Sequence, residues 1–175
     1  MPRRRFAVAL LLPDGLSREV DGLRRGLGDD RAHVAPHLTL VPPVNVREDA
    51  VPEALAVLNA AASTVEPFDL ELGPVATFHP VNPVVYLAVR GALDGLTALR
   101  GALFFAPLAR VVDHPFVPHV TIGTEVARER IPAALAALAD FDARWPVRTV
   151  DLLEDHAPGR CRWNPVAEAP LGHRY

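Results

Sequence analysis

The first hydrophobic run of the chain, FAVALLL at residues 6–12, contains no polar position. An uninterrupted apolar run of this length is typical of a central strand that is covered on both faces. The run follows three arginines and so resembles a signal peptide. However, a Pro-Asp-Gly turn ends it, and no small-residue cleavage pattern comes after it. We therefore predict a buried first strand.

Apolar residues at spacings of three and four predict four helices farther along the chain. We expect them at about residues 14–27, 47–64, 92–105 and 125–141, the last one broken or restarted at Pro132. The apolar stripe of the first helix consists of Leu16, Val20, Leu23 and Leu27. Asp14 or Ser17 could cap that helix.

Alternation of polar and apolar positions predicts the remaining strands. They are expected at about residues 37–41, 68–78, 84–89, 117–123, 147–153 and 161–167. Pro42 and Pro43 should end the strand that begins at residue 37, because proline cannot donate a hydrogen bond to a ladder.

The order of these elements looks like one unit used twice. We therefore predict an α+β fold with two pseudo-symmetric lobes, each a mainly antiparallel sheet with helices on its outer face, around a central cleft. No linker-like composition separates the halves, so residues 1–175 should form a single bilobed domain. An uninterrupted sheet in one lobe is the alternative topology.

Two of the predicted strands read almost alike, PHLTL at residues 36–40 and PHVTI at residues 118–122. Side chains at positions i and i+2 of a strand share one face, roughly 7 Å apart at a rise of about 3.3 Å per residue. His37 and Thr39 would therefore lie together, as would His119 and Thr121, while the apolar residues between them point into the core. Two such strands could place two His/Thr pairs around one small anion.

Composition narrows the range of partners. Among 175 residues, 50% are hydrophobic and 22% charged, which is ordinary for a soluble globular protein. The net charge of −3 argues against DNA or long RNA held along a broad basic face. All cationic side chains are arginines, whose planar fork suits phosphate. We expect no membrane partner, because no segment approaches the roughly 20 apolar residues of a membrane helix.

The single cysteine, Cys161, leaves no intrachain disulfide and no thiolate cluster for zinc, which favours a reducing, cytoplasmic setting. His33 and His114 precede the two motifs and would suggest a four-histidine metal site. Intervening prolines exclude a helical ligand face, and no carboxylate stands at a matching offset. We therefore expect no metal and no cofactor. His33 and His114 should be solvated, or should contact the motif histidines without reaching the ligand.

The paired His-x-Thr motifs, about eighty residues apart, resemble those of the 2H phosphoesterase superfamily. The resemblance is strongest to the RNA 2′,3′-cyclic phosphodiesterases, also called 2′-5′ RNA ligases, and it covers about residues 5–125. Further matches are Arg5-Phe6 at the first strand, Leu72-Gly73 followed by Phe78 before the strand that carries Tyr86, and Phe116-Val117 before the second motif.

The chain also differs from the family pattern at two places. Thr124 stands where these phosphodiesterases commonly carry an arginine, five residues beyond the second motif histidine. At residues 41–44, VPPV replaces the familiar Phe-Leu-Gly sequence. We expect substrate identity to depend on such positions.

The resemblance implies a metal-independent phosphodiesterase that opens 2′,3′-cyclic phosphates of nucleotides or RNA 3′ ends to 2′-phosphates, with reversible 2′-5′ ligation as an extension. It suggests His119 as the base that activates water and His37 as the acid; the residues alone leave this order open, since either imidazole can take either role. Thr39 and Thr121 would bind the phosphate.

The family also places Phe78 and Phe6 near the ligand, and a core position is the alternative for each ring. We expect a monomer that acts on a small cyclic phosphate. Two other functions stay open: a bilobed nucleotide or RNA-end sensor without turnover, and a 2H enzyme for a non-RNA substrate such as ADP-ribose cyclic phosphate.

Overall fold

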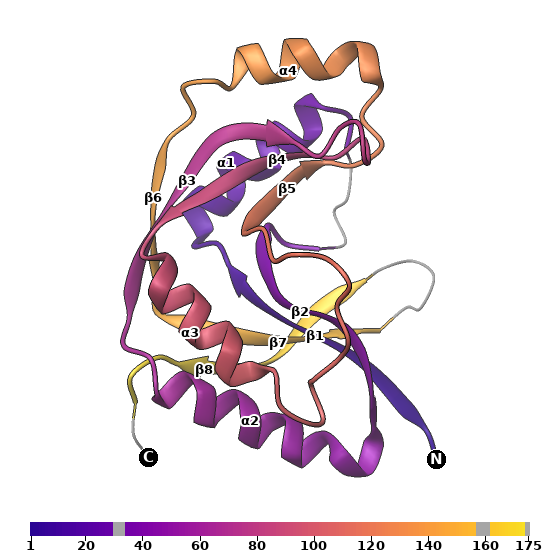
Figure 1. The fold of residues 1–175 in the computed structure, drawn as a ribbon, viewed down its shortest axis with the longest axis vertical. Coiled ribbons are helices and arrows are strands. Elements are labelled where there is room, and N and C mark those ends of the chain that lie inside the picture. Colours follow the sequence, from indigo (N-terminus) through magenta and orange to yellow (C-terminus); the bar gives the residue numbers. More distant parts are fainter. Residues whose placement is uncertain (30–33, 157–161, 174–175) are drawn as a thin grey trace.

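The computed structural model describes residues 1–29, 34–156 and 162–173 (Figure 1). The α-helices are α1 (Asp14–Gly26), α2 (Val51–Ser63), α3 (Leu93–Leu103) and α4 (Ile131–Ala137), with short 3-10 turns at Glu48–Ala50 and Arg128–Arg130. The strands are β1 (Arg3–Leu11), β2 (His37–Arg47), β3 (Phe68–Thr77), β4 (Val85–Gly91), β5 (His119–Gly123), β6 (Ala143–Val147), β7 (Thr149–Asp155) and β8 (Trp163–Pro170).

The strands form two antiparallel sheets, which confirms the predicted α+β class. Sheet A has the order β2-β1-β7-β8, and sheet B has the order β5-β4-β3-β6. In Figure 1 sheet B and α4 lie toward the top of the molecule, and sheet A and α2 lie toward the bottom. The two His-x-Thr strands are therefore both edge strands, β2 in sheet A and β5 in sheet B.

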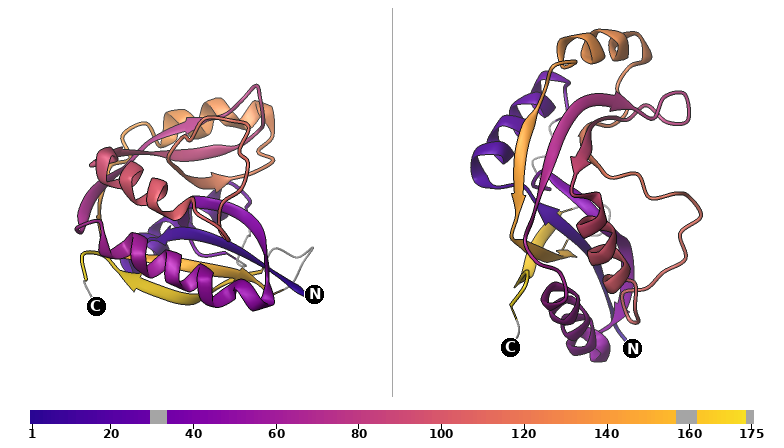
Figure 2. Two further views of the ribbon diagram at one scale, coloured as in Figure 1. Left: turned by 60° about the horizontal axis from the view of Figure 1, so that its bottom comes forward. Right: turned by 60° about the vertical axis from the view of Figure 1, so that its left-hand side comes forward.

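Helices cover the side of each sheet that carries the core. The helix α2 packs against β2, β7 and β8, and α3 packs against α2 and β2. On sheet B, α1 packs against β5 and α4 packs against β3. The right-hand view of Figure 2 shows α4 at one end of the molecule and α2 at the other. One hydrophobic cluster runs through both sheets, and residues 6–10 of the first strand are buried in it or beside it, as predicted.

The strand β2 is longer than predicted, because it continues through Pro42 and Pro43 to Arg47. The expectation that the two prolines end it was wrong. A proline is tolerated on an edge strand, where one side of the backbone has no ladder to supply. The pairing also slips here: Val8 lies opposite Val41, whereas Phe6 lies opposite Val44, so the prolines fall within an irregular stretch.

The region after the second motif also differs from the prediction. The expected helix over residues 125–141 is reduced to a 3-10 turn and α4, which begins beside Pro132. An additional strand, β6, follows it. Its apolar residues Trp145 and Val147 alternate with Arg144 and Pro146, and it pairs with β3 as the other edge of sheet B. None of the helices in the described ranges has the length and apolar character needed to cross a membrane.

Candidate active site

The two motif strands have the alternation that their sequences predict. Leu38, Leu40, Val120 and Ile122 are all 0% exposed and belong to the core. The histidine and threonine of each motif are half-buried and lie on the opposite face. We call this second surface the motif face of each sheet. Apolar anchoring of every other residue thus fixes which way the polar side chains point.

The two motif strands lie beside each other at the junction of the sheets, as β2 and β5 are packed together although neither sheet pairs them in a ladder. The two histidines are close enough for the charge on His119 to lower the pKa of His37. The fold therefore brings together the two motifs that the sequence separates.

Each motif histidine is held in the same way. The Nδ1 atom of His37 lies 2.7 Å from the carbonyl oxygen of Ala35, and the Nδ1 atom of His119 lies 2.6 Å from that of Val117. A carbonyl oxygen can only accept a hydrogen bond, so both rings carry a proton on Nδ1. In the neutral state, each ring keeps a lone pair on Nε2.

Burial lowers the pKa of both motif histidines. For His37, burial is the largest effect; the hydrogen bond to Ala35 opposes it, and the charges of Arg24 and His119 add to it. For His119, burial lowers the pKa and the hydrogen bond to Val117 opposes the change. Desolvation disfavours the charged imidazolium, so neutral rings predominate at pH 7.

Two aromatic rings lie beside His119. The rings of Phe78 and Tyr86 stack with centroids 4.3 Å apart, and each meets the His119 ring edge-on, at 5.0 and 5.3 Å. Tyr86 lies opposite Thr121 in the sheet, which places it on the motif face. Sequence reasoning did not select Tyr86 as a site residue, although the family resemblance included the strand that carries it.

The motif face of sheet A carries different residues from that of sheet B. Thr39 lies opposite Ala9, and Ala9 lies opposite Asp151 on β7, so the three form one row across the sheet. Asp151 is only 3% exposed. Burial, with the charge of Glu168 as a smaller cause, raises its pKa to about 6.

Phe6, the second aromatic residue proposed to lie near the ligand, is 0% exposed and packs in the core. It lies five residues before Leu11, the residue opposite His37, which is about 16 Å along a strand. Its role in substrate binding stays a prediction, which this burial does not favour.

The other residues singled out from the sequence lie elsewhere. His114 is exposed and its Nδ1 is 2.9 Å from Oδ1 of Asp113. His33 and Cys161 fall outside the described residues. Thr124, which replaces the family arginine, donates its backbone N–H to Oδ2 of Asp29, 3.0 Å away beyond the end of α1. In the part of the chain that the structure describes, no group of three or more His, Cys, Asp or Glu side chains could hold a metal ion.

Fold and site together define a two-histidine, two-lobed α+β protein. A family model described as the 2′-5′ RNA ligase superfamily matches residues 12–159. The chain therefore belongs to this superfamily, whose members are 2H phosphoesterases.

Similar proteins agree with this assignment. A protein of Bacillus thuringiensis (strain Al Hakam) named "Putative phosphoesterase" is 31% identical over 137 residues, which cover 77% of this chain and 79% of that protein. A "Putative phosphoesterase" of Bacillus cereus (strain AH187) matches equally well.

Solved structures share the fold at lower sequence identity. E. coli LigT in its apo form has a TM-score of 0.69 at 22% identity, covering 99% of this chain and all of LigT. The protein TT0787 of Thermus thermophilus has a TM-score of 0.71 at 21% identity, covering 98% of this chain and 100% of its own. A further LigT structure, complexed with 3′-AMP, has a TM-score of 0.71 at 22% identity and covers 98% of this chain and 100% of LigT.

Proposed function

We propose that this protein is a metal-independent phosphodiesterase that opens 2′,3′-cyclic phosphates of nucleotides or RNA 3′ ends to 2′-phosphates. One observation carries the proposal. Two edge strands from different sheets lie together, each with a histidine and a threonine on its motif face, and each histidine binds a backbone carbonyl through Nδ1. Membership of the superfamily supports the same class of reaction.

The reaction needs two proton transfers. A base takes a proton from water as the water oxygen attacks phosphorus, and an acid gives a proton to the departing 3′-oxygen as the P–O3′ bond breaks. Histidine can take either role near neutral pH. Because each Nδ1 is bound to a backbone carbonyl, each Nε2 is the atom that exchanges protons with substrate. After turnover the two histidines have exchanged protonation states, and solvent restores them.

We assign the base to His119 and the acid to His37, following the family. The hydroxyls of Thr39 and Thr121 donate hydrogen bonds to the non-bridging oxygens, whose negative charge grows as water adds to phosphorus. Donors that are already in place stabilise such a transition state without reorganisation. With a 5′-hydroxyl in place of water as the nucleophile, the same groups would form a 2′-5′ linkage as the P–O3′ bond breaks, and the reverse reaction would cleave that linkage.

The aromatic cluster beside His119 gives a place for the nucleoside. Phe78 and Tyr86 are half-buried and can present a ring face to a base. In the comparison structures, E. coli LigT is complexed with 3′-AMP, NADP+ and ATP, which are nucleotides. We therefore propose a nucleotide or a nucleotide-terminated RNA as the substrate.

The test is incubation of the purified protein with the four 2′,3′-cyclic mononucleotides, a cyclic-phosphate RNA and ADP-ribose cyclic phosphate, with a chelator present. We expect 2′-phosphates from the nucleotides at the same rate with and without chelator. Turnover of ADP-ribose cyclic phosphate alone would show that the substrate is neither RNA nor a 2′,3′-cyclic nucleotide. Micromolar nucleotide binding with no turnover would identify a sensor and contradict the proposal.

The pH profile of kcat/KM should be bell-shaped, since one ring must be neutral and the other protonated. Because burial lowers the pKa of both rings in the free protein, the maximum should lie below pH 6.5, the ordinary pKa of histidine. A profile that keeps rising above pH 7 would contradict this two-histidine scheme.

A further inference from the structure

Arg24 on α1 is a buried arginine. It follows Val20 by four residues, so it shares the buried stripe of the helix, and it is only 7% exposed. A guanidinium stays charged at every physiological pH, and its burial is costly unless its N–H groups are bound. The contacts it makes there therefore bear on its role.

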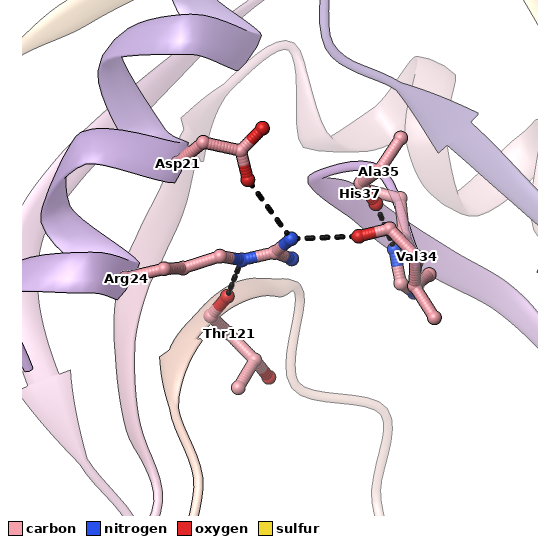
Figure 3. A network of polar contacts seen from close by, with 6 residues as sticks. All are labelled: Asp21, Arg24, Val34, Ala35, His37 and Thr121. Carbon is pink, nitrogen blue, oxygen red and sulfur yellow. Dashed lines mark hydrogen bonds and ion pairs between the residues drawn. The ribbon is translucent and has the colours of Figure 1, made fainter. Parts of the chain in front are cut away.

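Those contacts join the two motif segments (Figure 3). The Nε–H group donates to the backbone carbonyl of Thr121, 3.3 Å away in β5. The Nη1 atom donates to the carbonyl of Val34, 2.7 Å away in the segment before β2, and also lies 3.3 Å from Oδ1 of Asp21. Figure 3 shows the guanidinium between Thr121 and the segment that leads to His37.

The two carbonyls are directly connected to the reacting rings. Val34 precedes Ala35, whose carbonyl oxygen accepts the Nδ1–H group of His37. Thr121 is itself the threonine of the second motif and lies two residues from His119. No ladder joins β2 to β5 in the two described sheets, so the relative position of the motifs depends on side chains of this kind.

We infer that Arg24 is a positioning residue, which fixes the spacing of the two motif histidines by binding the backbone of both motif segments with one guanidinium. The inference rests on the proposed function, because it concerns the geometry of that reaction. In this role Arg24 acts through the backbone carbonyls of Thr121 and Val34. A planar fork with several fixed donors suits this task better than a lysine ammonium.

The charge of Arg24 also acts on His37. Among the described residues, the charged or titratable groups that act on the pKa of His37 are Arg24 on α1 and His119 on β5. Arg24 lowers the pKa of His37 by electrostatic repulsion of the imidazolium. Asp21 faces the guanidinium and offsets part of its charge.

The test compares Arg24→Met, which removes both charge and donors, with Arg24→Lys, which keeps the charge and loses the fork. Arg100→Met is the matched control. Arg100 is another partly buried arginine, and its Nε donates to the carbonyl of Leu40 in β2, 3.2 Å away. The measurements are circular dichroism and thermal melting, kcat and KM on the best 2′,3′-cyclic nucleotide, and NMR titration of both motif histidines.

In Arg24→Met we expect kcat to fall about 100-fold with KM changed less than about threefold, since a shift near 1 Å in reacting groups can cost this much. The pKa of His37 should rise, and that of His119 should change less. Arg24→Lys should keep the low pKa of His37 and recover only part of kcat. Arg100→Met should leave the pKa of His37 unchanged.

The inference is overturned if folded Arg24→Met keeps kcat within twofold and the His37 titration of the wild type, or if Arg100→Met reproduces both changes. Should Arg24→Met not fold, Asp21→Asn takes its place. That variant removes the offsetting carboxylate, so the pKa of His37 should fall farther; an unchanged pKa would contradict the electrostatic link.

The two proposals fail in different ways. If the wild type turns over no cyclic phosphate, the proposed function is wrong, whereas the NMR titrations still report on Arg24. If the wild type is active and Arg24→Met is equally active, only the role of Arg24 is wrong.

Discussion

The two motif strands have the same internal design in different surroundings. Both lie at a sheet edge, both bury the residue after each histidine and each threonine, and both bind Nδ1 to the carbonyl two residues before the ring. Around them the sheets differ. In the row of Thr121, sheet B places Tyr86 and then Ala76; in the row of Thr39, sheet A places Ala9 and then Asp151.

This comparison separates chemistry from recognition. What the two halves share, the imidazole, the hydroxyl and the carbonyl that sets the tautomer, is what proton transfer and phosphate binding require. What they do not share is the aromatic pair beside His119 and the cation beside His37. We therefore expect equivalent substitutions in the two motifs to have similar effects, and a change in the aromatic pair to affect the half that contains His119.

The largest effect should come from the histidines. His37→Ala and His119→Ala should each lower kcat/KM by about 10³-fold, because general acid and base catalysis each contribute on this scale. Since one turnover needs both rings, the double variant should be little worse than either single one. Rates on a 2′,3′-cyclic nucleotide, with circular dichroism as the folding control, test this. A double variant about 10³-fold below both singles would mean that the halves work independently.

The threonines come next. Thr39→Val and Thr121→Val keep the shape of the side chain and remove the donor, so each should lower kcat about 100-fold. Steady-state kinetics at saturating substrate measures the effect. If only one of the two matters, the halves are not equivalent in holding the phosphate, and the symmetric description of the site is wrong.

A smaller effect, confined to one half, is expected from the aromatic cluster. Phe78→Ala should raise KM about 10-fold with little change in kcat, because base stacking contributes about 1–3 kcal/mol to binding. Phe105→Ala is the control, an exposed aromatic residue outside the cluster. If Phe78→Ala raised KM equally for a cyclic phosphate that carries no base, Phe78 would act by supporting His119 and not by binding the nucleoside.

The smallest effect on activity should come from Asp151, whose role in the comparison is one of stability. Its pKa is raised from 3.8 to about 6, so the folded protein resists its ionisation. The free energy of unfolding should therefore fall as pH rises from about 4 through 6, and the loss should persist at higher pH.

Asp151→Asn should remove this pH-dependent loss of stability. It should raise the free energy of unfolding by about 3 kcal/mol at pH 8, at about 1.36 kcal/mol per pKa unit, and by much less at pH 4. Glu168→Gln should give part of the same gain, because the charge of Glu168 is the second cause of the raised pKa. Urea denaturation at both pH values is the measurement, and an equal gain at pH 4 would contradict the ionisation argument.

The sequence predicted what local patterns control. The apolar run at residues 6–12 became the inner strand β1, and the alternation in both motifs determined the buried face of β2 and β5. Repetition of the motif suggested two lobes, which the two sheets confirm. In each case, burial of the apolar positions is enough to determine the result.

Long-range context controlled the rest. Pro42, Pro43 and Pro146 are tolerated inside strands because β2 and β6 are sheet edges, which only the complete topology reveals. Sequence reasoning did not select Arg24, although its spacing of four residues from Val20 on the helix was a signal for burial. Its partners lie 10 and 97 positions away along the chain, beyond the reach of helical periodicity.

The central claim is that the two motifs form one site around one phosphate. The most direct test is NMR titration of the wild-type protein with a 2′-nucleotide, following the ring resonances of His37 and His119 together. The account predicts that both rings respond with a single, shared dissociation constant and that both pKa values rise as the phosphate binds. A response from only one ring, or two different dissociation constants, would contradict it.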